Sequence, residues 1–187
     1  MDQVSIWVNA SPERVWAMVS DVTRYGGWSP ENQGGHWVNG AQGADVGAKF
    51  IGVNQHGLLR WKTHCTVIEC QDNSRFAFAV AESRTQWGFY LEAKAGGTRL
   101  TEWRERVGVM PLPFRLLENS GLLGKPRDIW VVDGMRQTLE AIKRSVEQTE
   151  PGCPESPGGA RRSGTPPQSN EATWTQTSSS SARDRSA

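Results

Sequence analysis

The sequence lacks any run of about 18 or more apolar residues, the length that a membrane-spanning helix needs. It also lacks net charge, because 21 basic and 20 acidic residues leave only +1 at pH 7, without a broad positive field for nucleic acid. The first residues do not form a basic segment followed by an apolar stretch. We therefore expect a cytoplasmic protein with no integral membrane segment and no nucleic-acid partner.

Patterns that hold metals or phosphates are missing as well. His56 and His64 are too far apart to share a metal ion, about 26 Å along a strand at roughly 3.3 Å per residue, and no H-E-x-x-H pattern accompanies them. The three cysteines form no C-x-x-C pair, which favours structural thiols. The glycines of residues 121–125 faintly resemble a phosphate loop, but Pro126 replaces the expected Ser or Thr. We expect no metal and no cofactor.

The C-terminal part of the chain differs in composition from the rest. From residue 149 onward it is rich in Ser, Pro, Gly and Arg, with too few aliphatic residues to offset the entropy of ordering. We expect one domain over residues 1–148 and a disordered tail over residues 149–187. Trp174 is the only large apolar residue of this tail and could mark a protein-binding motif.

Hydrophobic periodicity predicts a sheet with helices at its start and end. Val4, Ile6 and Val8 alternate with outward residues, as in a strand with one buried face. Ser11-Pro12 is typical of a helix start, and Asp21 could cap a second short helix that ends near Gly27. Six further strands are predicted, near residues 35–39, 47–54, 58–70, 75–81, 85–94 and 98–108.

A long amphipathic helix is predicted at the end of the domain. Its apolar stripe recurs at steps of three and four and comprises Ile129, Val132, Met135, Leu139, Ile142 and Val146. Gly134 interrupts this helix, either to allow close approach to the sheet or to leave room for a ligand. Prolines and glycines in residues 111–126 predict a flap or a short helix before it.

Several short patterns in this order resemble a known family. They are Ile6–Asn9, Ser11–Trp16, Asp21, Trp28-Ser29-Pro30, Gly97-Thr98, Thr101-Glu102 and the final helix. They are similar to the START-like superfamily, in its polyketide cyclase/dehydrase branch, over residues 3 to about 148. The resemblance implies an α+β helix-grip fold: a seven-stranded curved antiparallel sheet around a long C-terminal helix, with two short helices after the first strand. It also implies a cavity for lipids, hormones or polyketides, with cyclisation or dehydration in some members.

Strand parity indicates which side chains would face that cavity. One face carries Trp61, Thr63, Cys65 and Val67, then Phe76, Phe78 and Val80, then Trp87, Phe89 and Leu91. These rings would either line an aromatic pocket or simply fill the core, and parity leaves both interpretations open. The candidate ligand-binding residues are Trp28, Trp61, Thr63, Phe78, Trp87, Phe89, Glu102, Arg104, Met135 and Leu139.

Two charged candidates lie on the last strand. If Leu100 points inward, Glu102 and Arg104 do so too, and could pair with each other and with a ligand carbonyl or hydroxyl. A buried Glu102 would have a raised pKa and is a weak candidate for a general acid or base. A structural ion pair near the cavity mouth is the alternative. His64 lies opposite to Trp61 in parity, which predicts a surface position.

Three functions remain open on this evidence. The first is a non-catalytic carrier or sensor of a small hydrophobic, lipid- or polyketide-like molecule. The second is a cyclase or dehydratase that uses Glu102 or Arg104 as acid, base or carbonyl anchor. A weaker third is a protein-interaction module that uses Trp174 or the flap. The sequence does not indicate the oligomeric state or the ligand.

Overall fold

The computed structural model describes residues 1–109, 127–148 and 175–176. The predicted flap at residues 111–126, Trp174 and nearly all of the predicted tail lie outside the described residues. The elements in chain order are β1 (Asp2–Val8), α1 (Pro12–Val19), the 3-10 helix η1 (Val22–Gly27), β2 (Asn32–Val38), β3 (Lys49–His56), β4 (Leu59–Gln71), β5 (Arg75–Val80), β6 (Thr85–Lys94), β7 (Gly97–Arg106), α3 (Arg127–Gln148) and β8 (Thr175–Gln176).

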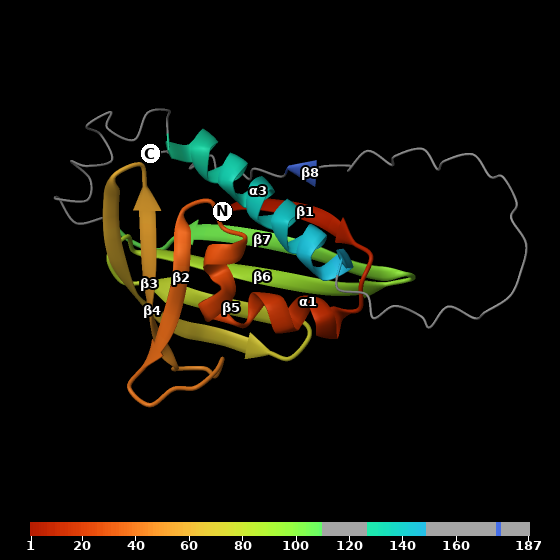
Figure 1. Ribbon diagram of the computed structural model, residues 1–187, viewed down its shortest axis with the longest axis horizontal. Helices are drawn as coiled ribbons and strands as arrows, with labels where there is room; N and C mark the ends of the chain where they lie inside the picture. The colour runs from red at the N-terminus through yellow and green to blue at the C-terminus, as the bar shows by residue number, and fades with distance from the viewer. Residues whose placement is uncertain (110–126, 149–174, 177–187) are drawn as a thin grey trace, which may run out of the picture.

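One curved antiparallel sheet contains all the strands, in the order β2-β3-β4-β5-β6-β7-β1-β8 (Figure 1). Strands β2 to β7 are neighbours in chain order. The first strand, β1, pairs with β7, where Val4 lies opposite Glu102. The predicted α+β helix-grip fold with seven main strands is therefore confirmed. The two-residue β8, which pairs with Val4 and Ser5 of β1, was not predicted.

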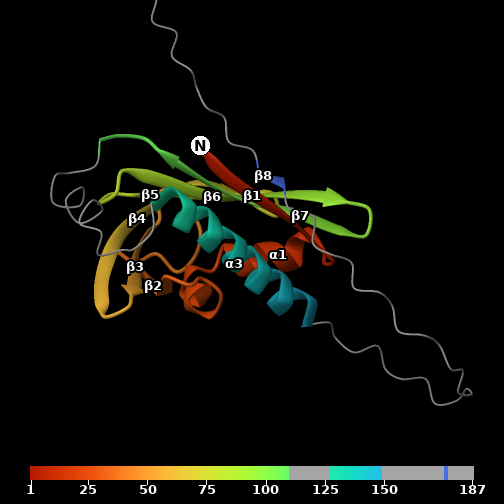
Figure 2. The ribbon, with the colours of Figure 1, turned by 90° about the horizontal axis from the view of Figure 1, so that it is seen from above.

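The helices α1, η1 and α3 lie on the same side of the sheet (Figure 2). Residues Val131, Met135, Leu139, Ile142 and Val146 of α3 are buried, at steps of three and four. The stripe thus includes Val131, which the sequence did not predict, while Val132 is only partly buried. Lys143 Nζ donates a hydrogen bond to the Trp7 carbonyl at 2.8 Å and so holds α3 against β1.

The strand parities hold because irregularities fall outside the segments that carry the aromatic rings. In β4 the register shifts only between Val67 and Glu69, so Cys65 and Val67 keep the phase of the preceding residues. A second shift separates Asn32 from Gly35 in β2. Bulges of this kind increase strand twist and bending, which helps the sheet curve around α3.

Candidate functional site

A cavity of about 230 Å³ lies on the helix side of the sheet. Its lining comes from η1 and the segment that follows, from strands β2 to β7 with the turn after β5, and from Thr138 of α3. Seven of the ten residues predicted to bind a ligand line it: Trp28, Trp61, Thr63, Phe78, Trp87, Phe89 and Glu102. These residues come from five separate elements or connections, so the fold gathers them around one space.

Aromatic side chains form much of the cavity wall. The rings of Tyr25 and Trp28 lie 4.3 Å apart, and those of Phe50 and Phe78 lie 5.2 Å apart in a T-shaped contact. Trp28 also meets Phe89 edge to face at 6.3 Å. The sequence left open whether these rings line a pocket or fill the core. Both are true, because the rings pack against one another and also border open space. Such a wall is rigid and suits flat or apolar molecules.

Glu102 supplies a carboxyl group to this apolar cavity. It lies opposite Phe89 in the β6–β7 register and is only 6% exposed. Its Oε2 atom accepts no hydrogen bond from the residues that the structure describes. Burial raises the pKa of the Glu102 carboxyl well above the ordinary value, because the charged form loses its hydration. The neutral acid is therefore the favoured form at pH values where an exposed glutamate is ionised.

Trp28 supplies a second polar atom without a partner. Its side chain lines the same cavity and is 7% exposed, and its indole Nε1 makes no hydrogen bond within the described part of the chain. By contrast, the hydroxyl of the neighbouring Tyr25 donates to the Val19 carbonyl at 2.7 Å. Trp28 and Glu102 are therefore two cavity-lining residues, each with a buried polar atom whose hydrogen-bonding capacity is unused within the described part of the chain.

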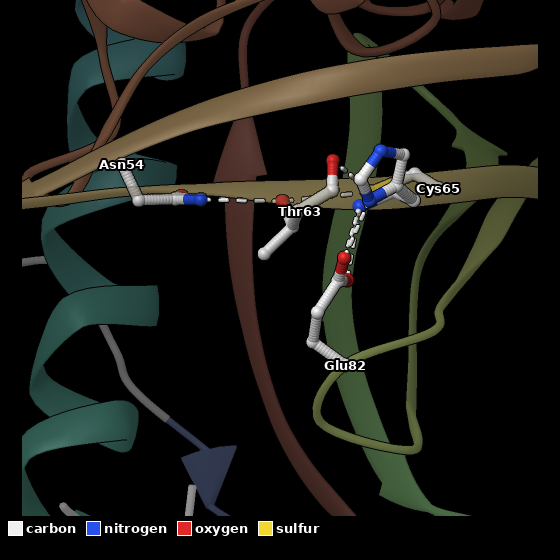
Figure 3. Close-up of polar contacts among 5 residues, drawn as sticks. Asn54, Thr63, Cys65 and Glu82 are labelled. Atoms are coloured by element: carbon white, nitrogen blue, oxygen red, sulfur yellow. Dashed lines mark hydrogen bonds and ion pairs between the residues drawn. The ribbon is translucent and has the colours of Figure 1, made fainter.

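Asn54 on β3 is a polar residue of the lining that the sequence pattern did not predict, and it contacts Thr63 on β4, which was predicted. Asn54 Nδ2 donates to Thr63 Oγ1 at 3.2 Å, and both residues line the cavity (Figure 3). Asn54 has the same parity as Phe50 in β3, a signal that could have found it. Cys65 lines the cavity beside them, and burial raises the pKa of its thiol to about 12. This thiol stays protonated near neutral pH and is a poor nucleophile.

Glu82 joins the turn after β5 to β4 at the edge of the cavity. Its carboxylate accepts two hydrogen bonds from the His64 backbone N–H, at 2.9 and 3.1 Å, and lies 2.6 Å from His64 Nδ1 (Figure 3). The His64 side chain is 69% exposed and that of Glu82 is 19% exposed. His64 thus has the predicted surface position, while Glu82 also lines the cavity.

Three predicted ligand-binding residues lie outside the cavity lining. Arg104 is buried, but its guanidinium lies 3.6 Å from Asp2 Oδ2 and 5.6 Å from the centre of the Trp87 ring. Leu139 is fully buried in the core. Met135 borders a smaller adjacent cavity of about 60 Å³, which Glu102 also borders.

Gly134 lies beside that smaller cavity. Among the described residues, a Cβ atom added there would meet only the Pro30 ring, at the ordinary contact distance of 3.9 Å. Close approach to the sheet therefore does not require a glycine at this position, and its missing side chain leaves room next to the ligand cavity.

Two classes of feature are not found among the described residues. No group of three or more His, Cys, Asp or Glu side chains is placed so that it could hold a metal ion. Within the same residues, no helix is both long enough and apolar enough to cross a membrane.

A curved antiparallel sheet that grips a C-terminal helix around an apolar cavity defines a ligand-binding domain of the helix-grip class. The family model described as polyketide cyclase/dehydrase and lipid transport matches residues 3–147, and the chain belongs to this family. The resemblance noted in the sequence is therefore confirmed. No curated protein matches the sequence significantly.

Solved structures share this fold. A polyketide-cyclase-like protein from Corynebacterium glutamicum is 28% identical, with a TM-score of 0.53, and the match covers 81% of this chain and 96% of that protein. A protein from Thermus thermophilus is 18% identical, with a TM-score of 0.58, 79% of this chain and 97% of that one being covered. A protein from Bacillus halodurans is also 18% identical, with a TM-score of 0.57 and coverages of 78% and 96%. The last two show the fold alone.

Proposed function

We propose that this protein binds one small hydrophobic molecule, lipid- or polyketide-like, in the cavity between α3 and the sheet. The observation that carries the proposal is the aromatic cavity of about 230 Å³ itself. Space on this scale would hold about eight water molecules at roughly 30 Å³ each, so it suits a compact ligand. Apolar walls with a few convergent polar groups are typical of small-molecule sites.

A neutral fluorescent probe, N-phenyl-1-naphthylamine, tests the location of binding. Thr138→Phe extends a ring from α3 into the cavity, and we expect at least about a tenfold weaker affinity for the probe, equivalent to about 1.4 kcal/mol. Gln137→Phe is the matched control, because Gln137 is the exposed neighbour on the same helix and does not line the cavity. Equal probe affinity in wild type and Thr138→Phe would contradict the proposal. Native mass spectrometry of the purified protein then identifies any molecule that it retains.

A cyclase or dehydratase activity is the second candidate. One observation favours it: Glu102 is a buried carboxyl with a raised pKa at the cavity wall, and could protonate a leaving hydroxyl group. Glu31 lines the same cavity and offers a second carboxylate that could accept a proton from carbon. Loss of turnover in Glu102→Gln, with ligand binding retained, supports catalysis. Stoichiometric binding without any turnover supports the carrier or sensor function.

A further inference from the structure

Trp28 Nε1 and Glu102 Oε2 are buried polar atoms without hydrogen-bond partners among the described residues, and both residues line the same cavity. Phe89 is a neighbour of both residues. Its ring meets the Trp28 ring edge to face at 6.3 Å, and its backbone lies opposite Glu102 in the sheet. Buried polar groups in folded proteins are almost always hydrogen-bonded, and exceptions call for an explanation. A ligand atom that reaches both groups explains why neither has a partner within the described protein residues.

Both groups are hydrogen-bond donors. The indole N–H of Trp28 can only donate. Burial raises the pKa of Glu102, which favours the protonated carboxyl group, and the O–H of that form can donate as well. The other titratable groups of the lining are Tyr25, Glu31, Cys65 and Glu82, and no Lys, Arg or His among the described residues lines the cavity.

The cation on the same face of β7, Arg104, does not change the donor role assigned to Glu102. Arg104 lies two residues beyond Glu102, where its guanidinium faces Asp2 and the Trp87 ring. The Tyr25 hydroxyl is directed to the Val19 carbonyl and so does not supply a partner. One oxygen with two lone pairs and no proton of its own can accept a hydrogen bond from each of two donors.

We propose that Trp28 and Glu102 form a two-donor subsite for a carbonyl oxygen, so that the ligand is a compact apolar ketone or quinone. This inference rests on the proposed function, because it places the carbonyl-bearing molecule in the same cavity. The aromatic wall accommodates the ring system, and the two donors fix its orientation. A carboxylate ligand fits poorly, because its charge would lose hydration among apolar rings without a cation in the described lining.

Three tricyclic probes of one skeleton test the subsite: fluorene, 9-fluorenone and 9-fluorenol. Their affinities are measured by quenching of tryptophan fluorescence and checked by calorimetry. We expect wild type to bind 9-fluorenone about tenfold or more tightly than fluorene, the effect of two added hydrogen bonds. We expect 9-fluorenol to bind more weakly than 9-fluorenone, because a hydroxyl oxygen that accepts from both donors must leave its own proton against the apolar wall.

Variants separate the two donors from the shape of the cavity. Trp28→Phe and Glu102→Leu each remove one donor and should reduce the preference for 9-fluorenone over fluorene, taken as the ratio of the two affinities in the same variant, to about threefold. Glu102→Gln keeps an N–H donor and should keep most of the preference. Far-UV circular dichroism shows whether the variants are folded.

The outcomes distinguish this inference from the proposed function. If wild type binds fluorene and 9-fluorenone equally, or 9-fluorenol most tightly, the carbonyl subsite is wrong although the cavity still binds hydrophobic molecules. The same conclusion follows if both donor-removing variants keep the full preference. If none of the three probes nor N-phenyl-1-naphthylamine binds, the proposed function itself fails.

Discussion

Glu102→Gln should change how the stability of the domain depends on pH. Burial raises the pKa of the Glu102 carboxyl well above the ordinary value of 4.5, which it regains in the unfolded chain. Between these two pKa values the folded protein holds a proton that the unfolded chain has released. The free energy of unfolding is therefore highest below the unfolded-state pKa and falls as the pH rises toward the folded-state pKa.

The expected slope follows from the linkage of one proton. Wild type should lose about 1.4 kcal/mol of stability per pH unit within this window, relative to Glu102→Gln, which cannot titrate. Each further pH unit inside the window adds the same difference in stability between the two proteins. The cavity-lining groups Tyr25, Glu31, Cys65 and Glu82 are the same in both proteins, so the difference isolates Glu102.

Urea unfolding at about pH 5, 6 and 7, followed by tryptophan fluorescence, measures this difference. Glu105→Gln is the matched control, because it removes an exposed carboxyl from the same strand and should leave the slope of wild type unchanged. Parallel stability curves for wild type and Glu102→Gln would refute the reasoning, since they would mean that Glu102 is ionised in the folded domain.

Two further predictions concern packing and thiol reactivity. Gly88→Ala should lower the free energy of unfolding by about 1–3 kcal/mol in urea titrations, because an added Cβ would lie 2.7 Å from the Phe76 carbonyl and the Trp103 ring. Gly27→Ala, where nothing lies within 4 Å, should cost less, and equal losses would contradict this account. With its pKa of about 12, the Cys65 thiol is ionised to about one part in 10⁴ at pH 8, and burial restricts access further. A variant with Cys70 and Cys153 replaced by Ser should therefore react with a disulfide reagent at a small fraction of the rate of an exposed cysteine, and rapid labelling would show that the cavity opens.

Strand parity predicted which face of the sheet a side chain lies on, but not whether that side chain borders the cavity. Glu102 and Arg104 have the same parity, and both are buried, yet only Glu102 borders the cavity. Arg104 lies two residues beyond Glu102 along β7. It pairs across the sheet with Asp2, the first residue of β1. Alternation fixes the face of a side chain, whereas its position along the cavity depends on how the strands are staggered. That stagger is a property of the assembled sheet.

The helix shows the same limit. Its apolar period predicted the buried stripe, but Leu139 fills the core while the polar Thr138 borders the ligand cavity. Which residues touch open space depends on the distance and angle between α3 and the curved sheet, which the period does not contain. Asn54 was overlooked for a different reason, since its parity was readable but a lone amide among apolar residues carries little weight by itself.

The cost of an empty cavity connects these observations to function. At roughly 24 cal/mol per Å³, a dry apolar cavity of about 230 Å³ would cost up to about 5.5 kcal/mol, comparable to the net stability of many domains. The polar groups of Asn54 and Thr63 reduce this cost by offering partners to water. An apolar ligand gains by displacing that water from the aromatic wall, but it leaves the buried Trp28 Nε1 and Glu102 Oε2 atoms without partners among the described residues. These two atoms therefore favour a ligand with an acceptor oxygen at that end of the cavity.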